Sequence, residues 1–107
     1  MAFARLQWPP TVRRGEDFEV RVSIRHPMET GYRVDDSGTP YRRNAIREIV
    51  CRYNGTVVFR ARTNTGIAAN PYLRLFVTAV ASGEIAVEWI DDAGERGDAR
   101  GPVTVAP

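Results

Sequence analysis

Side chains that could do chemistry are scarce in this 107-residue chain, which has one His and one Cys. His26 and Glu29 could form an acid–base pair, although a lone His at a strand end is more typical of a hydrogen-bonded structural role. Together with Asp35 and Asp36 they could hold a metal, but one His is weak support and acidic loops are usually only solvated. Cys51 cannot form an internal disulfide. We therefore expect no catalytic site, no metal and no cofactor.

The charges of the chain argue against several classes of function. All 15 basic residues are Arg, and 13 acidic residues leave a formal net charge of +2. The absence of Lys excludes Schiff-base, P-loop and lysine general-base mechanisms. Arg52, Arg60 and Arg62 could form a basic patch, but nucleic-acid-binding proteins usually have a larger, more segregated positive excess. We expect no nucleic-acid partner and no membrane span, because no apolar run approaches the ~20 residues that a span requires.

The alternation of apolar and polar residues predicts the strands that must position these side chains. Within residues 17–25 the apolar positions are Phe18, Val20, Val22 and Ile24, and every residue between them is polar. A strand places those four side chains on one face, whereas a helix would scatter them. The same alternation is less clean in four other segments, at residues 4–8, 73–77, 85–89 and 103–105.

The middle of the chain contains a hairpin signal. The Asn54-Gly55 pair suits a tight turn and is flanked by β-rich runs at residues 49–53 and 57–62. A plain two-residue loop would mix apolar and Arg side chains on each face, whereas one additional residue separates them. The apolar face would then contain Ile49, Cys51, Tyr53, Val57, Phe59 and Ala61. We therefore predict a bulge or a longer loop, with Cys51 facing the core.

These patterns predict an all-β fold in a single domain over residues 1–107. With six or seven short strands, we expect an immunoglobulin-like antiparallel β-sandwich of about seven strands. A closed small barrel is the alternative. Two connections, residues 26–43 and 63–71, are longer than such a fold needs. Long loops in compact domains are usually functional or mobile, so we interpret the protein as a binding module.

Four motifs, in a fixed order, carry a resemblance to a known family. They read HPMETG at residues 26–31, CRYNG at 51–55, GIAANP at 66–71 and WIDDAG at 89–94. With these motifs at this spacing, nearly the whole chain resembles the SoxZ family. Its members are the smaller subunits of the SoxYZ sulfur carrier of bacterial thiosulfate oxidation. The resemblance implies an immunoglobulin-like sandwich, in agreement with the strand pattern.

The resemblance also implies a function that the residues alone do not show. In that family the sulfur substrate is carried on a Cys of the partner, SoxY, at the end of a Gly-rich arm. This chain would be the non-catalytic half of a heterodimer with a SoxY-like carrier, and would help present the arm to other Sox enzymes, its transient partners. The resemblance implies a periplasmic location without a signal peptide of its own. A stand-alone protein-binding module is the alternative.

The two long loops are the candidate partner surface, because interfaces favour aromatic, Met and Arg side chains. The residues expected to contact the partner or its arm are His26, Pro27, Met28, Glu29, Thr30, Gly31, Tyr32, Ile67, Ala68, Asn70 and Pro71. The residues expected to attract anionic sulfur adducts are Arg33, Arg42 and Arg43. The alternative is that both loops fold back on their own sandwich.

Overall fold

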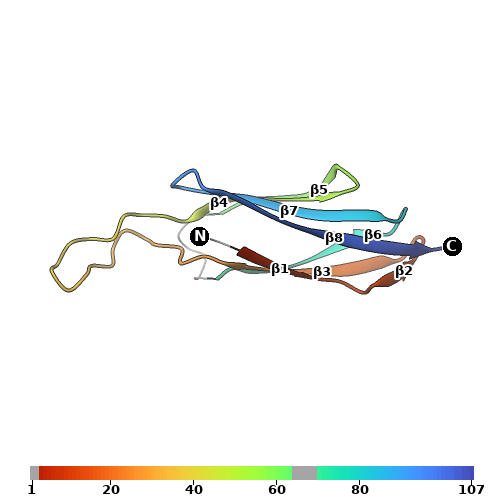
Figure 1. The fold of residues 1–107 in the computed structure, drawn as a ribbon, viewed down its shortest axis with the longest axis horizontal. Helices are drawn as coiled ribbons and strands as arrows, with labels where there is room; N and C mark the ends of the chain where they lie inside the picture. The colour runs from red at the N-terminus through yellow and green to blue at the C-terminus, as the bar shows by residue number, and fades with distance from the viewer. Residues whose placement is uncertain (1–2, 64–69) are drawn as a thin grey trace.

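Two facing β-sheets make up the protein, shown by a computed structural model that describes residues 3–63 and 70–107. The strands are β1 (Phe3–Gln7), β2 (Thr11–Arg13), β3 (Asp17–Arg25), β4 (Ile46–Tyr53), β5 (Thr56–Arg62), β6 (Tyr72–Thr78), β7 (Gly83–Asp91) and β8 (Arg96–Ala106). One sheet has the order β1-β3-β6 and the other the order β2-β8-β7-β4-β5. Figure 1 shows the two layers. The predicted all-β sandwich is confirmed.

Strand β3 has the bounds that its alternation predicts, and its four apolar side chains are buried. The strand that the sequence did not reveal is β2, which makes the described total eight. It pairs in parallel with β8, Thr11 opposite Thr104, whereas the other strand pairs are antiparallel. Strand β2 has three residues, of which only Val12 is buried, and three residues are too few to show an alternating pattern in the sequence.

The bulge predicted in the β4–β5 hairpin is confirmed. Tyr53 pairs with Thr56 across a two-residue turn, and the register then shifts so that Cys51 pairs with Phe59. Val58 is the additional residue. The prediction was wrong for Val57, because the shift falls after it: Val57 still lies opposite Arg52, and its side chain is exposed.

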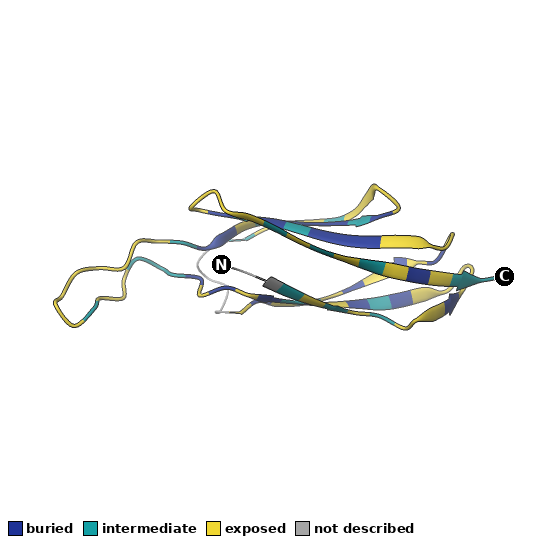
Figure 2. Cartoon of the chain, viewed as in Figure 1, coloured by how far each residue is buried: buried dark blue, intermediate teal, exposed yellow. Residues whose placement is uncertain are grey.

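The core lies between the two sheets, where the buried faces of the strands meet (Figure 2). One long side of the sandwich is open, since β5 and β6 are edge strands of different sheets. There the exposed side chains of Val58, Phe76 and Val80 line a shallow groove together with Tyr53. We call this the edge groove. In the described part of the chain, no helix has the length and apolar character to cross a membrane.

Residues 26–45 leave the sandwich at one end and return to it, and we call this segment the finger. It projects well beyond the strands in Figure 1, and the molecule is 60 Å long but only 19 Å across in the other two directions. Most of its outer part is exposed (Figure 2). The first of the two long loops is therefore an extended projection.

Candidate functional site

Backbone hydrogen bonds pair the two arms of the finger. Near its base, Glu29 and Asn44 exchange N–H···O bonds of 2.8 and 2.9 Å, and farther out the N–H of Tyr41 donates to the carbonyl of Arg33 at 2.8 Å. At the tip, the Asp35 carboxylate accepts from the N–H groups of Ser37 and Thr39, both at 2.9 Å. These N–H donors lower the pKa of Asp35. The finger therefore has a defined hairpin-like path.

Exposed aromatic and apolar side chains gather on the outer half of the finger. Tyr32 is 91% exposed, and Val34 and Tyr41 are also exposed. The Arg33 guanidinium lies 3.9 Å from the centre of the Tyr41 ring and forms an ion pair with Glu29. Tyr32, Tyr41 and Arg33 are residue types that are enriched in protein–protein interfaces.

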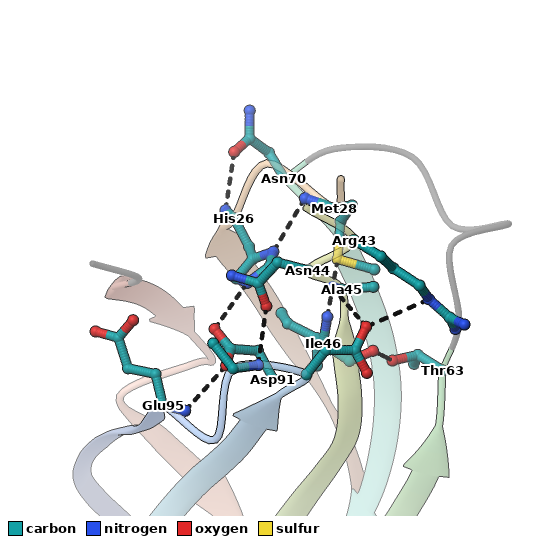
Figure 3. A network of polar contacts seen from close by, with 12 residues as sticks. His26, Met28, Arg43, Asn44, Ala45, Ile46, Thr63, Asn70, Asp91 and Glu95 are labelled. Atoms are coloured by element: carbon teal, nitrogen blue, oxygen red, sulfur yellow. Dashed lines mark hydrogen bonds and ion pairs between the residues drawn. The ribbon is translucent and has the colours of Figure 1, made fainter. Parts of the chain in front are cut away.

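A buried polar network fixes the base of the finger to the body (Figure 3). His26 is 3% exposed; its Nε2 lies 3.1 Å from Asp91 Oδ2, and its Nδ1 accepts the N–H of Met28 at 3.0 Å. Because Nδ1 accepts, Nε2 carries the proton and donates to Asp91. The His26 N–H donates to Asn70 Oδ1 at 3.1 Å, and the Asn70 N–H donates back to the His26 carbonyl at 2.7 Å.

Asp91, the last residue of β7, and Asp92, in the turn that follows, also bond to the base of the finger and its surroundings. Asp91 Oδ1 accepts the N–H of Glu95 at 2.9 Å. Burial alone would raise the pKa of Asp91, but the hydrogen bonds from His26 and Glu95 outweigh it and lower the pKa. Asp92 accepts the Ala45 N–H at 3.0 Å and donates its own N–H to the Ala45 carbonyl at 2.9 Å.

Met28 is a core residue, although we expected it among the residues that contact the partner. It is 4% exposed, and its Sδ accepts the N–H of Ile46 at 3.3 Å. Its φ of 52° turns the side chain back toward the sandwich. His26 and Pro71 are also buried, whereas Pro27 and Tyr32 are exposed. The first motif is thus partly an anchor, and the outward part of the finger begins near Tyr32.

The acid–base pair considered for His26 and Glu29 does not form. Glu29 faces Arg33, which lowers the pKa of the Glu29 carboxyl, while His26 is bonded to Asp91. Within residues 3–63 and 70–107, no three His, Cys, Asp or Glu side chains come together as metal ligands would. Asp35, at the finger tip, makes its turn bonds instead.

The three Arg residues of the finger differ in their partners. Arg33 is paired with Glu29, and Arg43 lies 3.4 Å from Asp92. Arg42 is exposed and has no ion pair among the described residues. Attraction of anions by these residues stays a prediction, and neutralising carboxylates weaken its basis at two of the three positions.

The second long loop, residues 63–71, which contains GIAANP, is described only at its two ends. Ile67 and Ala68 lie outside the described residues, so their part in a partner surface stays a prediction. Asn70 has a φ of 55° and is bonded to His26, and the Pro71 carbonyl accepts the N–H of Ile24 at 2.9 Å. Sequence reasoning therefore missed that residues from three motifs, His26, Asn70 and Asp91, meet in one network.

Cys51 faces the core, as the hairpin register predicts. Its side chain is fully buried, and burial raises the pKa of the thiol to about 11. Because the thiolate is the reactive form, a buried thiol of this kind is inert at neutral pH. A nucleophilic role for Cys51 has no support in this geometry.

The fold and this end of the molecule define an immunoglobulin-like β-sandwich protein with an anchored, exposed finger. The family model described as "Sulphur oxidation protein SoxZ" matches residues 6–101. The chain therefore belongs to the SoxZ family, a component of the Sox sulfur oxidation system, as its motifs predict. No curated protein sequence matches the chain closely enough to count as a relative.

Solved structures with the same fold come from different functional classes. A superoxide reductase (neelaredoxin) from Ignicoccus hospitalis has a TM-score of 0.74 and 21% identity, covering 96% of this chain and 79–80% of that one. The sulfur carrier protein SoxY from Chlorobium limicola f thiosulfatophilum has a TM-score of 0.66 and 13% identity, covering 97% of this chain and 79% of that one. At these identities the likeness shows the fold alone.

Proposed function

We propose that this chain is a non-catalytic subunit that binds a SoxY-like carrier and helps present the carrier's cysteine-bound sulfur adduct to other Sox enzymes. The observation that carries the proposal is the family match over residues 6–101. An inert, buried Cys51 and a His26 committed to structural bonds are consistent with a partner that carries the chemistry. The proposed location is the periplasm, reached together with the partner.

We further propose that the finger contacts the carrier or its arm. Tyr32 supplies the largest exposed aromatic surface there, and Arg33 is held in place by Glu29 and Tyr41. A side chain already held in one rotamer loses less entropy on binding, so the finger is preorganised for contact. The network at His26 and Asp91 fixes the direction in which the finger projects.

A matched pair of substitutions tests this surface. Tyr32→Ser removes the most exposed ring of the finger, and Phe76→Ser removes a ring that is 68% exposed in the edge groove. We expect Tyr32→Ser to weaken binding to a SoxY-type carrier by about tenfold or more, as central aromatic contacts do. Phe76→Ser should leave binding unchanged. Both variants should keep the thermal unfolding midpoint of the parent protein.

The opposite pattern would contradict the proposal. If Phe76→Ser weakens binding and Tyr32→Ser does not, the carrier docks along the open side of the sandwich. If the parent protein itself shows no affinity for the carrier in titration calorimetry, the function as a carrier-binding subunit is wrong.

A further inference from the structure

We propose that strand β6 pairs edge to edge with the β6 strand of a second copy of this chain. Such pairing would join the three-stranded sheets of the two copies into one continuous sheet. β6 is an edge strand on the open side of the sandwich. The inference does not rest on carrier binding, because the finger projects from one end of the molecule whereas β6 belongs to the body of the sandwich (Figure 1).

The hydrogen bonds at the two ends of the β3–β6 ladder show which backbone groups of β6 are free. At one end the Ile24 N–H donates to the Pro71 carbonyl at 2.9 Å. At the other end the Ala79 N–H donates to the Glu16 carbonyl at 2.8 Å. Antiparallel pairs alternate between bonded and non-bonded, so the β6 residues that bond to β3 are Leu73, Leu75 and Val77. The residues whose N–H and C=O groups point to the open side are Tyr72, Arg74, Phe76 and Thr78.

The other edge strands have features that oppose such pairing. β5 is interrupted by the bulge at Val58. β2 has three residues, and β1 has five, is followed by Pro9 and Pro10, and packs against β8. Short strands, bulges and prolines are the usual protections of a sheet edge. β6 has seven residues, no Pro and an unbroken register with β3. Among the described strands, its edge is therefore the one best suited to another strand.

The sequence of β6 is complementary to itself in one antiparallel register. With Leu75 opposite its own copy on a two-fold axis, every outward-bonding residue finds a partner. Tyr72 lies opposite Thr78 of the second copy. Arg74 lies opposite Phe76 of the second copy, so a guanidinium meets an aromatic ring, which is a favourable cross-strand pair. A shift of two residues one way places Arg74 opposite itself, and a shift the other way leaves Tyr72 beyond the end of the partner strand.

The side chains on this edge are exposed and partly fixed. Phe76 is 68% exposed and Tyr72 is 54% exposed, so pairing would remove apolar surface from water. Arg74 is held by Glu19 through a bond of 2.6 Å, which reduces the entropy it loses on contact. One strand from each copy is a small interface, so we expect a dissociation constant of about 100 μM. The chain would then be monomeric in dilute assays and dimeric when concentrated.

Sedimentation equilibrium of the isolated chain, from about 10 μM to about 1 mM, measures this association. We expect a reversible monomer–dimer equilibrium. Phe76→Arg places a like charge opposite Arg74 and should weaken the dimer at least about tenfold. It should still fold, because Glu19 lies opposite this position on β3. Val57→Arg adds the same charge to an exposed position on edge strand β5 and should change nothing. A parent chain that stays monomeric, or equal losses in the two variants, would overturn the proposal.

Disulfide cross-linking between different variants tests the register. Residues in a bonded antiparallel pair have Cα atoms about 5.5 Å apart, which is within reach of a disulfide. Arg74→Cys and Phe76→Cys chains are mixed with oxidised glutathione, and the native Cys51 does not interfere because it is buried. We expect the mixture to form a covalent dimer several-fold faster than either variant alone. Equal or faster cross-linking within one variant would contradict the assigned pairing.

The same variants separate this proposal from the proposed function. Phe76→Arg should bind a SoxY-type carrier as tightly as the parent protein does, and Tyr32→Ser should still dimerise when concentrated. Loss of dimerisation with intact carrier binding in Phe76→Arg supports self-pairing at β6. If the isolated chain stays monomeric and Phe76→Arg loses affinity for the carrier, the β6 edge is a carrier surface and the self-pairing is wrong.

Discussion

His26 illustrates what a single residue of this chain does. Sequence reasoning favours a hydrogen-bonded structural role for a lone His at a strand end, and the buried bonds to Asp91 and Met28 confirm it. Its partner could not be predicted, because Asp91 is 65 residues away in the sequence. Met28 was expected at the partner surface because interfaces favour Met. Its burial was not predictable from composition, since it depends on a positive φ in the loop.

Removal of the buried charge at Asp91 tests the anchor. Asp91→Asn keeps the shape of the side chain but replaces the charged carboxylate, which accepts the bonds from His26 and Glu95, with a neutral amide. We therefore expect the free energy of unfolding at pH 7 to fall by about 2–3 kcal/mol. Urea denaturation measures this change. Asp98→Asn, which affects an exposed ion pair with Arg100, is the control and should cost much less than Asp91→Asn.

The same anchor predicts a pH dependence. The pKa of Asp91 is lowered in the folded protein, so its contribution is fully present above the unfolded value of about 3.9 and is lost as the pH falls through the folded value. The stability difference between the parent protein and Asp91→Asn should therefore narrow below about pH 4. A difference that widens on acidification would contradict the assigned role.

At the scale of elements, strands with long alternation were predictable and short ones were not. The nine residues of β3 alternate long enough to identify the buried face. The three residues of β2 form a strand only because they pair with the edge of β8. The β4–β5 bulge followed from the requirement that Arg and apolar side chains occupy opposite faces. The residue at which the bulge occurs could not be predicted, because Val57 is acceptable on either face.

Deletion of single residues tests the bulge. Removal of Val58 leaves Cys51 opposite Phe59 and restores a plain ladder, so the folded state should lose less than about 2 kcal/mol. Removal of Arg60, two residues on, shifts Ala61 to the outer face and should be far more destabilising. Thermal unfolding of both variants measures the difference. Equal loss in the two deletions would mean that Val58 is not the additional residue.

For the whole molecule, the sandwich architecture and the family were visible in the sequence, but the meeting of the motifs was not. HPMETG, GIAANP and WIDDAG are separated by dozens of residues, and only the fold shows that His26, Asn70 and Asp91 share one network. The resulting molecule carries its exposed finger at one end of the sandwich.

In the proposed function this chain binds a carrier and does not itself carry sulfur. Co-expression with a SoxY-type carrier, followed by native mass spectrometry of the complex and of its separated subunits, tests both parts. We expect a one-to-one heterodimer in which every sulfur adduct mass lies on the carrier and Cys51 stays a free thiol. An adduct on Cys51, or this chain recovered without the carrier, would contradict it.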